Sequence, residues 1–230
     1  MTCDKYLDAL RGFAHFFNKY WSPTQQVIVC GFTPPKFDLP ENFTFFSIGK
    51  QEDYPVKKWS DGLLHVMDSF PSEKHFVLML EDYWLCQPVN TDAVSILYRY
   101  MVQFDYVIKM DLVGDRRFAG GVMDYGDVAH IPLVKSDPNS AYHSSLMTGI
   151  WNADHMRKYI IPDESPWDVE LAGTGRLSAF GDELLVLGTK LDPWPVKHIL
   201  AYRSNDPTKL LVQDMSEYDK DEVRGLGYDF

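Results

Sequence analysis

Apolar positions along the chain alternate between helix-like and strand-like spacing, which predicts an α/β fold. In residues 5–20 and 56–70, apolar and aromatic side chains recur every three or four positions, as in a helix that buries one face. Short apolar runs of strand length occupy residues 26–32, 43–48 and 76–80. Because strands and helices alternate, we expect a mostly parallel central sheet flanked by helices.

The second half of the chain continues this alternation around a less regular middle. We expect a helix from Thr91, which can cap it, to about residue 104, and a strand from Tyr106 to Leu112. Residues 113–144 are rich in Gly, Asp and Pro, and we expect short strands and loops there. A strand-like segment over residues 145–152 precedes a short helix over residues 153–159.

The composition fits a single folded domain over residues 1–230. Hydrophobic residues make up 45% of the chain and aromatic residues 14%, which is enough for a substantial core. The tail from about residue 214 is highly charged and contains Gly225 and Gly227, so we expect either a mobile flap or a fraying end.

Apolar run lengths and cysteine spacing predict the location of the protein. No apolar run approaches the roughly 20 residues that a membrane span needs, and the first residues lack the apolar core of a signal peptide. The three cysteines have no metal-binding spacing and are expected to be reduced thiols. We therefore expect a cytoplasmic protein.

The charge balance argues against a surface built for non-specific nucleic-acid binding. The formal net charge is −11, whereas phosphate contacts need clustered Lys and Arg side chains. A local basic groove is still open, and the basic doublets that could contribute to it are Lys57-Lys58, Arg116-Arg117 and Arg157-Lys158.

The most informative segment is FVLMLEDYWL, residues 76–85, in which an apolar run ends at two adjacent carboxylates. We expect a buried central strand that presents Glu81 and Asp82 at its carboxyl end, where open α/β sheets bind ligands. Paired carboxylates suit Mg²⁺ or Mn²⁺, which take the rest of their ligands from water and substrate phosphates. The alternative is that one acid caps the following segment and the other is solvated.

A second group of acids lies in DESPWDVELAGT, residues 163–174. Ser165 and Pro166 predict a helix start, and Asp168 is placed to complete a capping box, which competes with a catalytic role for this acid. Glu170 follows Trp167 by three residues, so the two side chains share a helix face. Partial desolvation by the indole would raise the pKa of Glu170 toward that of a general base.

The order of three segments resembles a group of bacterial and phage glycosyltransferases with the GT-A fold. These segments are LEDYWL, SLMTGIWNADHMRKYI and ESPWDVE, and the resemblance extends over about residues 25–205. It implies a Rossmann-like GT-A domain that binds a nucleotide-sugar, such as a UDP-sugar, and transfers the sugar to an acceptor hydroxyl.

The resemblance also implies roles for individual residues. Asp82 would hold Mn²⁺ or Mg²⁺ on the donor diphosphate, and Glu81 would contact the ribose or the sugar. Glu-Asp-Tyr replaces the usual Asp-x-Asp, so the number of direct metal ligands is open and one acid can act through water. His198 would be a third ligand, unless it is a core or surface histidine. Glu170 would be the general base of an inverting mechanism.

Further positions follow from the chemistry of such a site. Arg116 and Arg117 are candidates for phosphate or acceptor contacts, because a leaving diphosphate develops negative charge. Trp151 and Trp167 offer flat faces for the acceptor, although some tryptophans will be core residues. Gly31 and Thr33, at the end of the first strand, are expected beside the nucleotide.

Three functional alternatives remain open. The first is a metal-dependent glycosyltransferase acting on a saccharide or another hydroxylated acceptor. The second is a phage-type glycosyltransferase that modifies hydroxymethylated bases in DNA. The third is a non-catalytic sugar-nucleotide binding protein or a nucleotide-sugar hydrolase. P-loop, dinucleotide-binding glycine and nucleophile-elbow motifs are missing from the sequence, which disfavours those enzyme classes.

Overall fold

The computed structural model describes residues 1–117, 120–202, 206 and 209–230. The chain divides into two units. Unit 1 consists of Met1–Asp53, Leu80–Val89 and Val196–Phe230, and unit 2 of Tyr54–Met79 and Asn90–Pro195. The predicted single domain stays a prediction, because this division reflects contacts and not independent folding.

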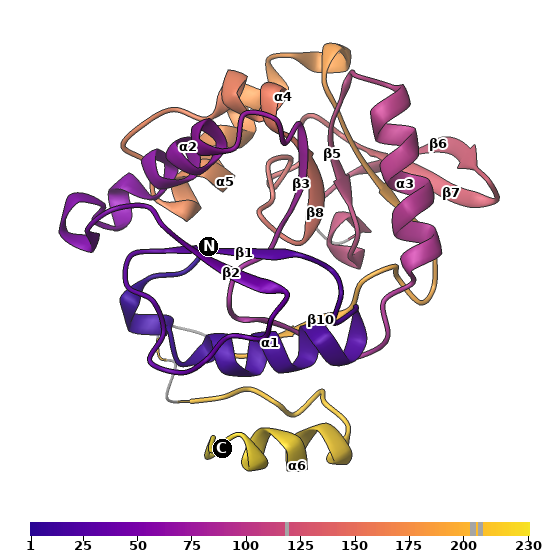
Figure 1. Cartoon of the computed structure of the whole chain (residues 1–230). Helices are drawn as coiled ribbons and strands as arrows, with labels where there is room; N and C mark the ends of the chain where they lie inside the picture. The colour runs from indigo at the N-terminus through magenta and orange to yellow at the C-terminus, as the bar shows by residue number, and fades with distance from the viewer. Residues whose placement is uncertain (118–119, 203–205, 207–208) are drawn as a thin grey trace. The chain divides into compact units, whose positions relative to one another are not determined.

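Unit 1 combines two helices with two small sheets (Figure 1). Its elements are η1 (Asp4–Tyr6), α1 (Ala9–Tyr20), β1 (Val27–Gly31), β2 (Phe43–Ser47), η2 (Gln51–Asp53), β4 (Tyr83–Leu85), β10 (His198–Leu200) and α6 (Glu217–Gly225). β1 pairs with β2 in parallel, and β4 pairs with β10 antiparallel. The core forms where Phe13, Phe16 and Phe17 of α1 are buried, with Phe16 stacked on the fully buried Trp84 of β4.

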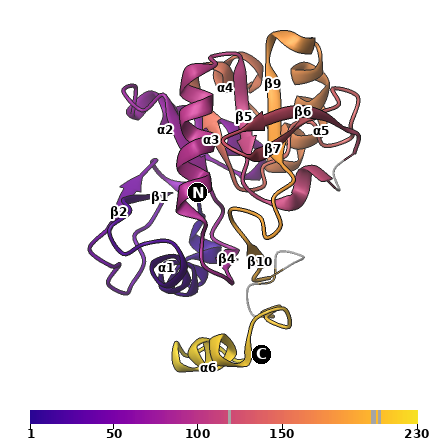
Figure 2. The same ribbon diagram turned by 90° about the vertical axis from the view of Figure 1, so that its right-hand side faces the viewer.

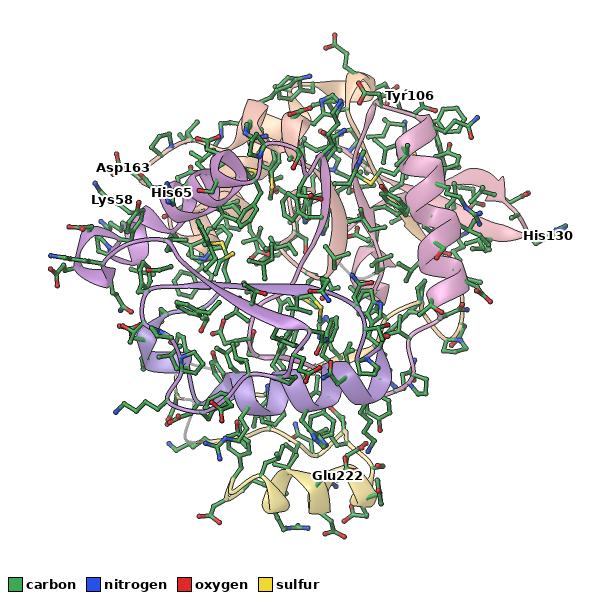
Figure 3. All side chains as sticks on the ribbon, viewed as in Figure 1. Lys58, His65, Tyr106, His130, Asp163 and Glu222 are labelled. Atoms are coloured by element: carbon green, nitrogen blue, oxygen red, sulfur yellow. The ribbon has the colours of Figure 1, made fainter. Side chains whose placement is uncertain are left out.

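The charged tail contains a helix that charged groups hold to α1. Lys19 Nζ lies 2.6 Å from both Asp219 Oδ1 and Glu222 Oε2, and Asp219 is fully buried. Glu222, labelled in Figure 3, also accepts a 3.0 Å contact from His15 Nε2. The sequence left a mobile flap or a fraying end open. The structure has a helix that these charged contacts hold to α1 and whose Val223 is buried.

Unit 2 is built around a mixed sheet of six strands in the order β3-β8-β5-β9-β7-β6 (Figure 2). The strands are β3 (His75–Leu78), β5 (Val107–Asp111), β6 (Val122–Val128), β7 (Ile131–Ser136), β8 (Gly149–Asn152) and β9 (Leu185–Thr189). Helices flank this sheet, with α3 on one side and α4 and α5 on the other (Figure 1). The helical elements are η3 (Val56–Lys58), α2 (Trp59–Ser69), α3 (Thr91–Gln103), η4 (Gly114–Arg117), α4 (Ala153–Tyr159), α5 (Pro166–Ser178) and η5 (Gly181–Glu183).

The α/β class is confirmed, but the sheet is not mostly parallel. β5 and β9 pair in parallel, whereas β8 runs antiparallel to both β3 and β5, and β7 is antiparallel to β6 and β9. The irregular middle of the sequence forms the β6–β7 hairpin. Its two-residue turn places Ala129 at φ 47° and His130 at φ 66°, which matches the twist of a tight hairpin.

The strand before the acid pair differs from the predicted buried central strand. β3 is the terminal strand of the six-stranded sheet, and Val77 is 37% exposed. An apolar run of strand length cannot by itself distinguish a central strand from a terminal one, because strand order depends on pairing with distant segments. β5, in contrast, is buried along its whole length.

Local helix signals were more reliable. α4 covers residues 153–159 as predicted, and α5 begins at Pro166 with Ser165 as its cap. The start of α3 differs by one position, because the Asn90 side chain, and not Thr91, accepts the Ala93 N–H. Among the described residues, no helix has the length and apolar character that crossing a membrane requires.

Candidate functional site

Glu81 and Asp82 lie in a tight turn that leads into β4 of unit 1. The Tyr83 N–H donates to the Leu80 carbonyl at 3.1 Å, and the Trp84 N–H donates to the Asp82 carbonyl at 3.1 Å. The buried Trp84 indole also donates to the Glu81 carbonyl at 3.1 Å. These bonds fix the backbone that presents the two acids.

Tyr202, two residues beyond β10, holds Glu81 of the acid pair. Its hydroxyl donates to Glu81 Oε1 at 2.5 Å, and the preceding Ala201 N–H donates to the Asp82 carbonyl at 2.7 Å. Glu81 and Tyr202 are both buried, and the Tyr202 ring stacks on Tyr6 with centroids 5.1 Å apart. Glu81 is therefore turned inward, which differs from the predicted contact with a ribose or sugar.

The electrostatics of the pair are unusual for carboxylates. Burial raises the pKa of Glu81 above its ordinary value. Burial, reinforced by the negative charge of Glu81, raises the pKa of the half-buried Asp82 to about 7. Two adjacent acids in a poorly solvated position resist double ionisation, and a cation would relieve this cost.

His198 is not brought to Asp82. In the β4–β10 pair, His198 lies opposite Leu85, at the end of β4 that is farther from Asp82. The Ala201 N–H donates to the Asp82 carbonyl beyond the opposite end of the pair. The His198 ring stacks on Tyr83 at 4.4 Å, and burial lowers its pKa to about 4. The ring nitrogens of His198 are buried and its ring packs against Tyr83, so the structure does not place this predicted ligand beside Asp82.

The fit of Mn²⁺ or Mg²⁺ consequently depends on Asp82. Within the part of the chain that the structure describes, no group of three or more His, Cys, Asp or Glu side chains forms a ligand cluster. A single carboxylate beside a second acid still suits Mg²⁺ or Mn²⁺, since these ions keep several waters and bind substrate phosphates. Asp82 alone could hold only a cation that takes most of its ligands from water or from another molecule.

Gly31 and Thr33 lie at the carboxyl end of β1, in the same unit as the acid pair. A Cβ atom on Gly31 would come within 2.9 Å of Thr2 Cγ2, so a glycine is needed for this approach. The Thr33 N–H and hydroxyl donate to the two carboxylate oxygens of Asp4 at 3.0 Å and 2.9 Å. Both predicted nucleotide positions are thus in contact with the N-terminal segment.

Arg116 has an internal role in place of the predicted phosphate contact. Its side chain is 1% exposed, and Nε donates to Asp111 Oδ2 at 2.7 Å. Nη1 donates to Ser136 Oγ and to the Tyr142 carbonyl, at 3.0 Å and 2.9 Å. A phosphate could reach this guanidinium only by breaking these bonds. The side chain of Arg117 lies outside what the structure describes.

The buried charge cluster around Asp111 was not predicted from the sequence. Lys109, Asp111 and Arg116 are all buried, and Lys109 Nζ lies 2.5 Å from Asp111 Oδ1 and donates to the Ser145 carbonyl at 2.6 Å. Burial alone would raise the pKa of Asp111, but Arg116 and Lys109 outweigh it and hold that pKa below the usual range. This cluster is a closed internal network.

The acids of α5 separate into two roles. Asp168 Oδ2 accepts from the Ser165 N–H at 3.0 Å and from Ser165 Oγ at 2.6 Å, which completes the capping box. These hydrogen bonds lower the pKa of Asp168, which opposes a role as a base. Glu170 Oε1 accepts the Leu146 N–H at 2.7 Å, so its carboxylate is oriented toward the segment before β8.

The two predicted acceptor tryptophans differ in exposure. Trp167 on α5 is 51% exposed, which leaves a flat face accessible to a ligand. Trp151 on β8 is fully buried, with Lys109 Nζ 5.0 Å from its ring centroid. Trp151 is therefore a core residue, which corrects its assignment to the acceptor.

The described sites lie in both units: Gly31, Thr33, Glu81, Asp82 and His198 in unit 1, and Arg116, Trp151, Trp167, Asp168 and Glu170 in unit 2. Comparisons of the chain with protein-family models, curated protein sequences and solved structures gave no match.

Proposed function

We propose that this chain is a glycosyltransferase that moves a sugar from a nucleotide-sugar, such as a UDP-sugar, to a hydroxyl of a saccharide or other small acceptor. The observation that supports this most strongly is the Glu81–Asp82 pair, two adjacent acids in one turn whose pKa values are both raised by burial. With this function we propose the GT-A fold for the whole chain, Mn²⁺ or Mg²⁺ as cofactor, and a cytoplasmic location.

In this proposal Asp82 is the direct ligand and Glu81 is a supporting acid. Asp82 is half-buried, and its backbone carbonyl accepts the Ala201 N–H, so the backbone position from which its side chain extends is fixed. Glu81 is the adjacent acid, and the Tyr202 hydroxyl holds its carboxylate. When bound, the cation would neutralise charge on the departing nucleoside diphosphate.

Glu170 is the residue that we assign to the acceptor proton. A general base must lie within hydrogen-bonding reach of the attacking hydroxyl, and the Leu146 amide already orients one oxygen of Glu170. The exposed Trp167, one helical turn earlier, offers the apolar face on which a sugar ring can stack. We leave Asp168 out of this role, because its carboxylate completes the capping box.

Transfer to bases in DNA has no support in the placement of the basic doublets. Lys58 Nζ lies 3.9 Å from Asp163, and Figure 3 shows the two side chains next to each other. Arg157 contacts Asp68 at 3.3 Å and Asp154 at 3.4 Å. Acidic neighbours therefore accompany these cations, which weakens the attraction to a phosphate backbone.

A thermal-shift screen of nucleotide-sugars, each with and without Mn²⁺, tests the proposal. A ligand that binds only the folded state raises the melting temperature as its concentration exceeds Kd. We expect one nucleotide class to stabilise the protein only with Mn²⁺. Stabilisation by no nucleotide-sugar under either condition would contradict the proposal.

The variant Glu170→Gln then separates a transferase from a non-catalytic binding protein. Loss of a general base lowers kcat by about 10²–10⁴-fold, while donor binding should stay unchanged. The measurement is release of the nucleoside diphosphate with saccharide acceptors present and absent. Release without any acceptor would instead identify a nucleotide-sugar hydrolase.

A further inference from the structure

The N-terminal segment lies across the end of β1, where the nucleotide is expected. The Thr2 N–H donates to the Cys30 carbonyl at 2.9 Å, and the Thr2 methyl group fills the space beside Gly31. Thr2 is itself buried. The segment Thr2–Tyr6 therefore covers the last residues of β1.

Asp4 occupies a pair of donors that would suit an anionic ligand. Its carboxylate accepts both the N–H and the hydroxyl of Thr33, at 3.0 Å and 2.9 Å. Its own N–H donates to Gln51 Oε1 at 2.7 Å. An N–H and an O–H that converge on one carboxylate are also the donors that would bind a phosphate or sugar oxygen.

Tyr6 connects the same segment to the acid pair. Its ring stacks on Tyr202 at 5.1 Å with an interplanar angle of 25°. Tyr202 in turn donates to Glu81. Thr2–Tyr6 thus contacts the end of β1 and the residue that positions the acids.

We propose that Thr2–Tyr6 is a strap that occupies the donor end of unit 1 and moves aside when a nucleoside diphosphate binds. This inference rests on the proposed function, because it assigns the end of β1 to the donor. Asp4 opposes a diphosphate in two ways, by filling the Thr33 donors and by its negative charge. Asp4 and Lys5 of the strap are exposed and Thr2 is buried, so opening the strap breaks the Thr2, Asp4 and Tyr6 contacts given above.

The test compares Asp4→Ala with Asp8→Ala. Asp8 is the next acid along the chain and is exposed, so this control removes the same charge close by. Titration calorimetry with UDP, GDP, ADP and CDP, each with Mn²⁺, measures affinity. For the nucleotide that binds, Asp4→Ala should increase affinity at least about fivefold, and Asp8→Ala should change it by less than about twofold.

Hydrogen exchange gives a second readout on the wild-type chain. Saturation with the same nucleotide and Mn²⁺ should speed amide exchange in residues 2–6 and slow it at Thr33. Increased protection of residues 2–6, or equal nucleotide affinity of Asp4→Ala and wild type, would overturn the strap while leaving the transferase proposal intact. Binding of no diphosphate by either protein would overturn both.

Discussion

Two groups of buried carboxylates in this protein have opposite electrostatics. In unit 1, Glu81 accepts from the neutral Tyr202 hydroxyl, and the pKa values of Glu81 and Asp82 are raised by burial. In unit 2, Asp111 lies between Lys109 and Arg116, and its pKa is held below the usual range despite complete burial. Burial raises the pKa of each of these acids, and at Asp111 two cationic partners outweigh it.

This difference separates a structural acid from a candidate binding acid. The Asp111 cluster contains its own cations and hydrogen-bond acceptors, so it is complete without a ligand. Glu81 accepts from the neutral Tyr202 hydroxyl, and the N-terminal amino group lowers the pKa of both acids by less than burial raises it. A divalent cation would add compensating charge at this pair. The comparison therefore favours a structural role for the Asp111 cluster and a binding role for the Glu81–Asp82 pair.

The largest effect is expected from Asp111→Asn. The substitution leaves Lys109 and Arg116 buried without a counter-charge, so we expect the free energy of unfolding to fall by about 3–5 kcal/mol. Urea denaturation followed by tryptophan fluorescence measures this change. Asp124→Asn is the matched control, because Asp124 pairs with Lys190 at the surface with 80% of its side chain exposed. A loss as small in Asp111→Asn as in this control would show that Asp111 is not structural.

A smaller effect is expected from Tyr202→Phe. The variant keeps the ring that stacks on Tyr6 but leaves the buried Glu81 without its donor, which costs about 1–3 kcal/mol. Tyr6→Phe is the control, since it preserves both the stack and the Tyr202 hydrogen bond. The double variant Tyr202→Phe/Glu81→Gln measures the coupling between the two groups, and additive losses would rule out the hydrogen bond as the cause.

A third expected effect is a pH dependence of stability that differs in sign between the two groups. The pKa of Asp82 rises from 3.8 to about 7 on folding, so the folded protein binds more protons between these values. Asp82 therefore contributes stability below pH 4 that is lost as the pH rises toward 7. Asp111, whose pKa is lowered, contributes stability above pH 4 that is lost on acidification.

Denaturation of wild type and Asp82→Asn from pH 4 to 8 isolates the Asp82 contribution. The difference in stability between the two proteins should change across pH 4–7 and level off above pH 7. A difference that is constant over the whole range would mean that Asp82 titrates normally.

Helix starts and caps, which depend on residues close together in the sequence, were predicted well. Ser165, Pro166 and Asp168 lie within four positions of one another, and their capping box is present. The short helix expected over residues 153–159 is likewise present as α4. Such signals depend on bonds within one helical turn, which makes them visible in a single sequence.

Features set by distant residues could not be predicted in this way. Tyr202 and Glu81 are separated by 121 positions, and neither has a local pattern that identifies the other. Arg116 follows Asp111 by only five positions, but an exposed loop arginine and a buried ion pair have the same sequence. The antiparallel insertion of β8 also depends on pairing between remote strands, so strand alternation suggested a more parallel sheet.

The most direct test of the account is Mn²⁺ binding at Asp82. Mn²⁺ is titrated in the presence of UDP into wild type, Asp82→Asn and Asp168→Asn, the last being an acid of the α5 capping box. The account predicts that Asp82→Asn weakens Mn²⁺ binding by at least about tenfold, or more than ~1.4 kcal/mol, while Asp168→Asn binds as wild type does. Equal Mn²⁺ affinity in Asp82→Asn and wild type would contradict it.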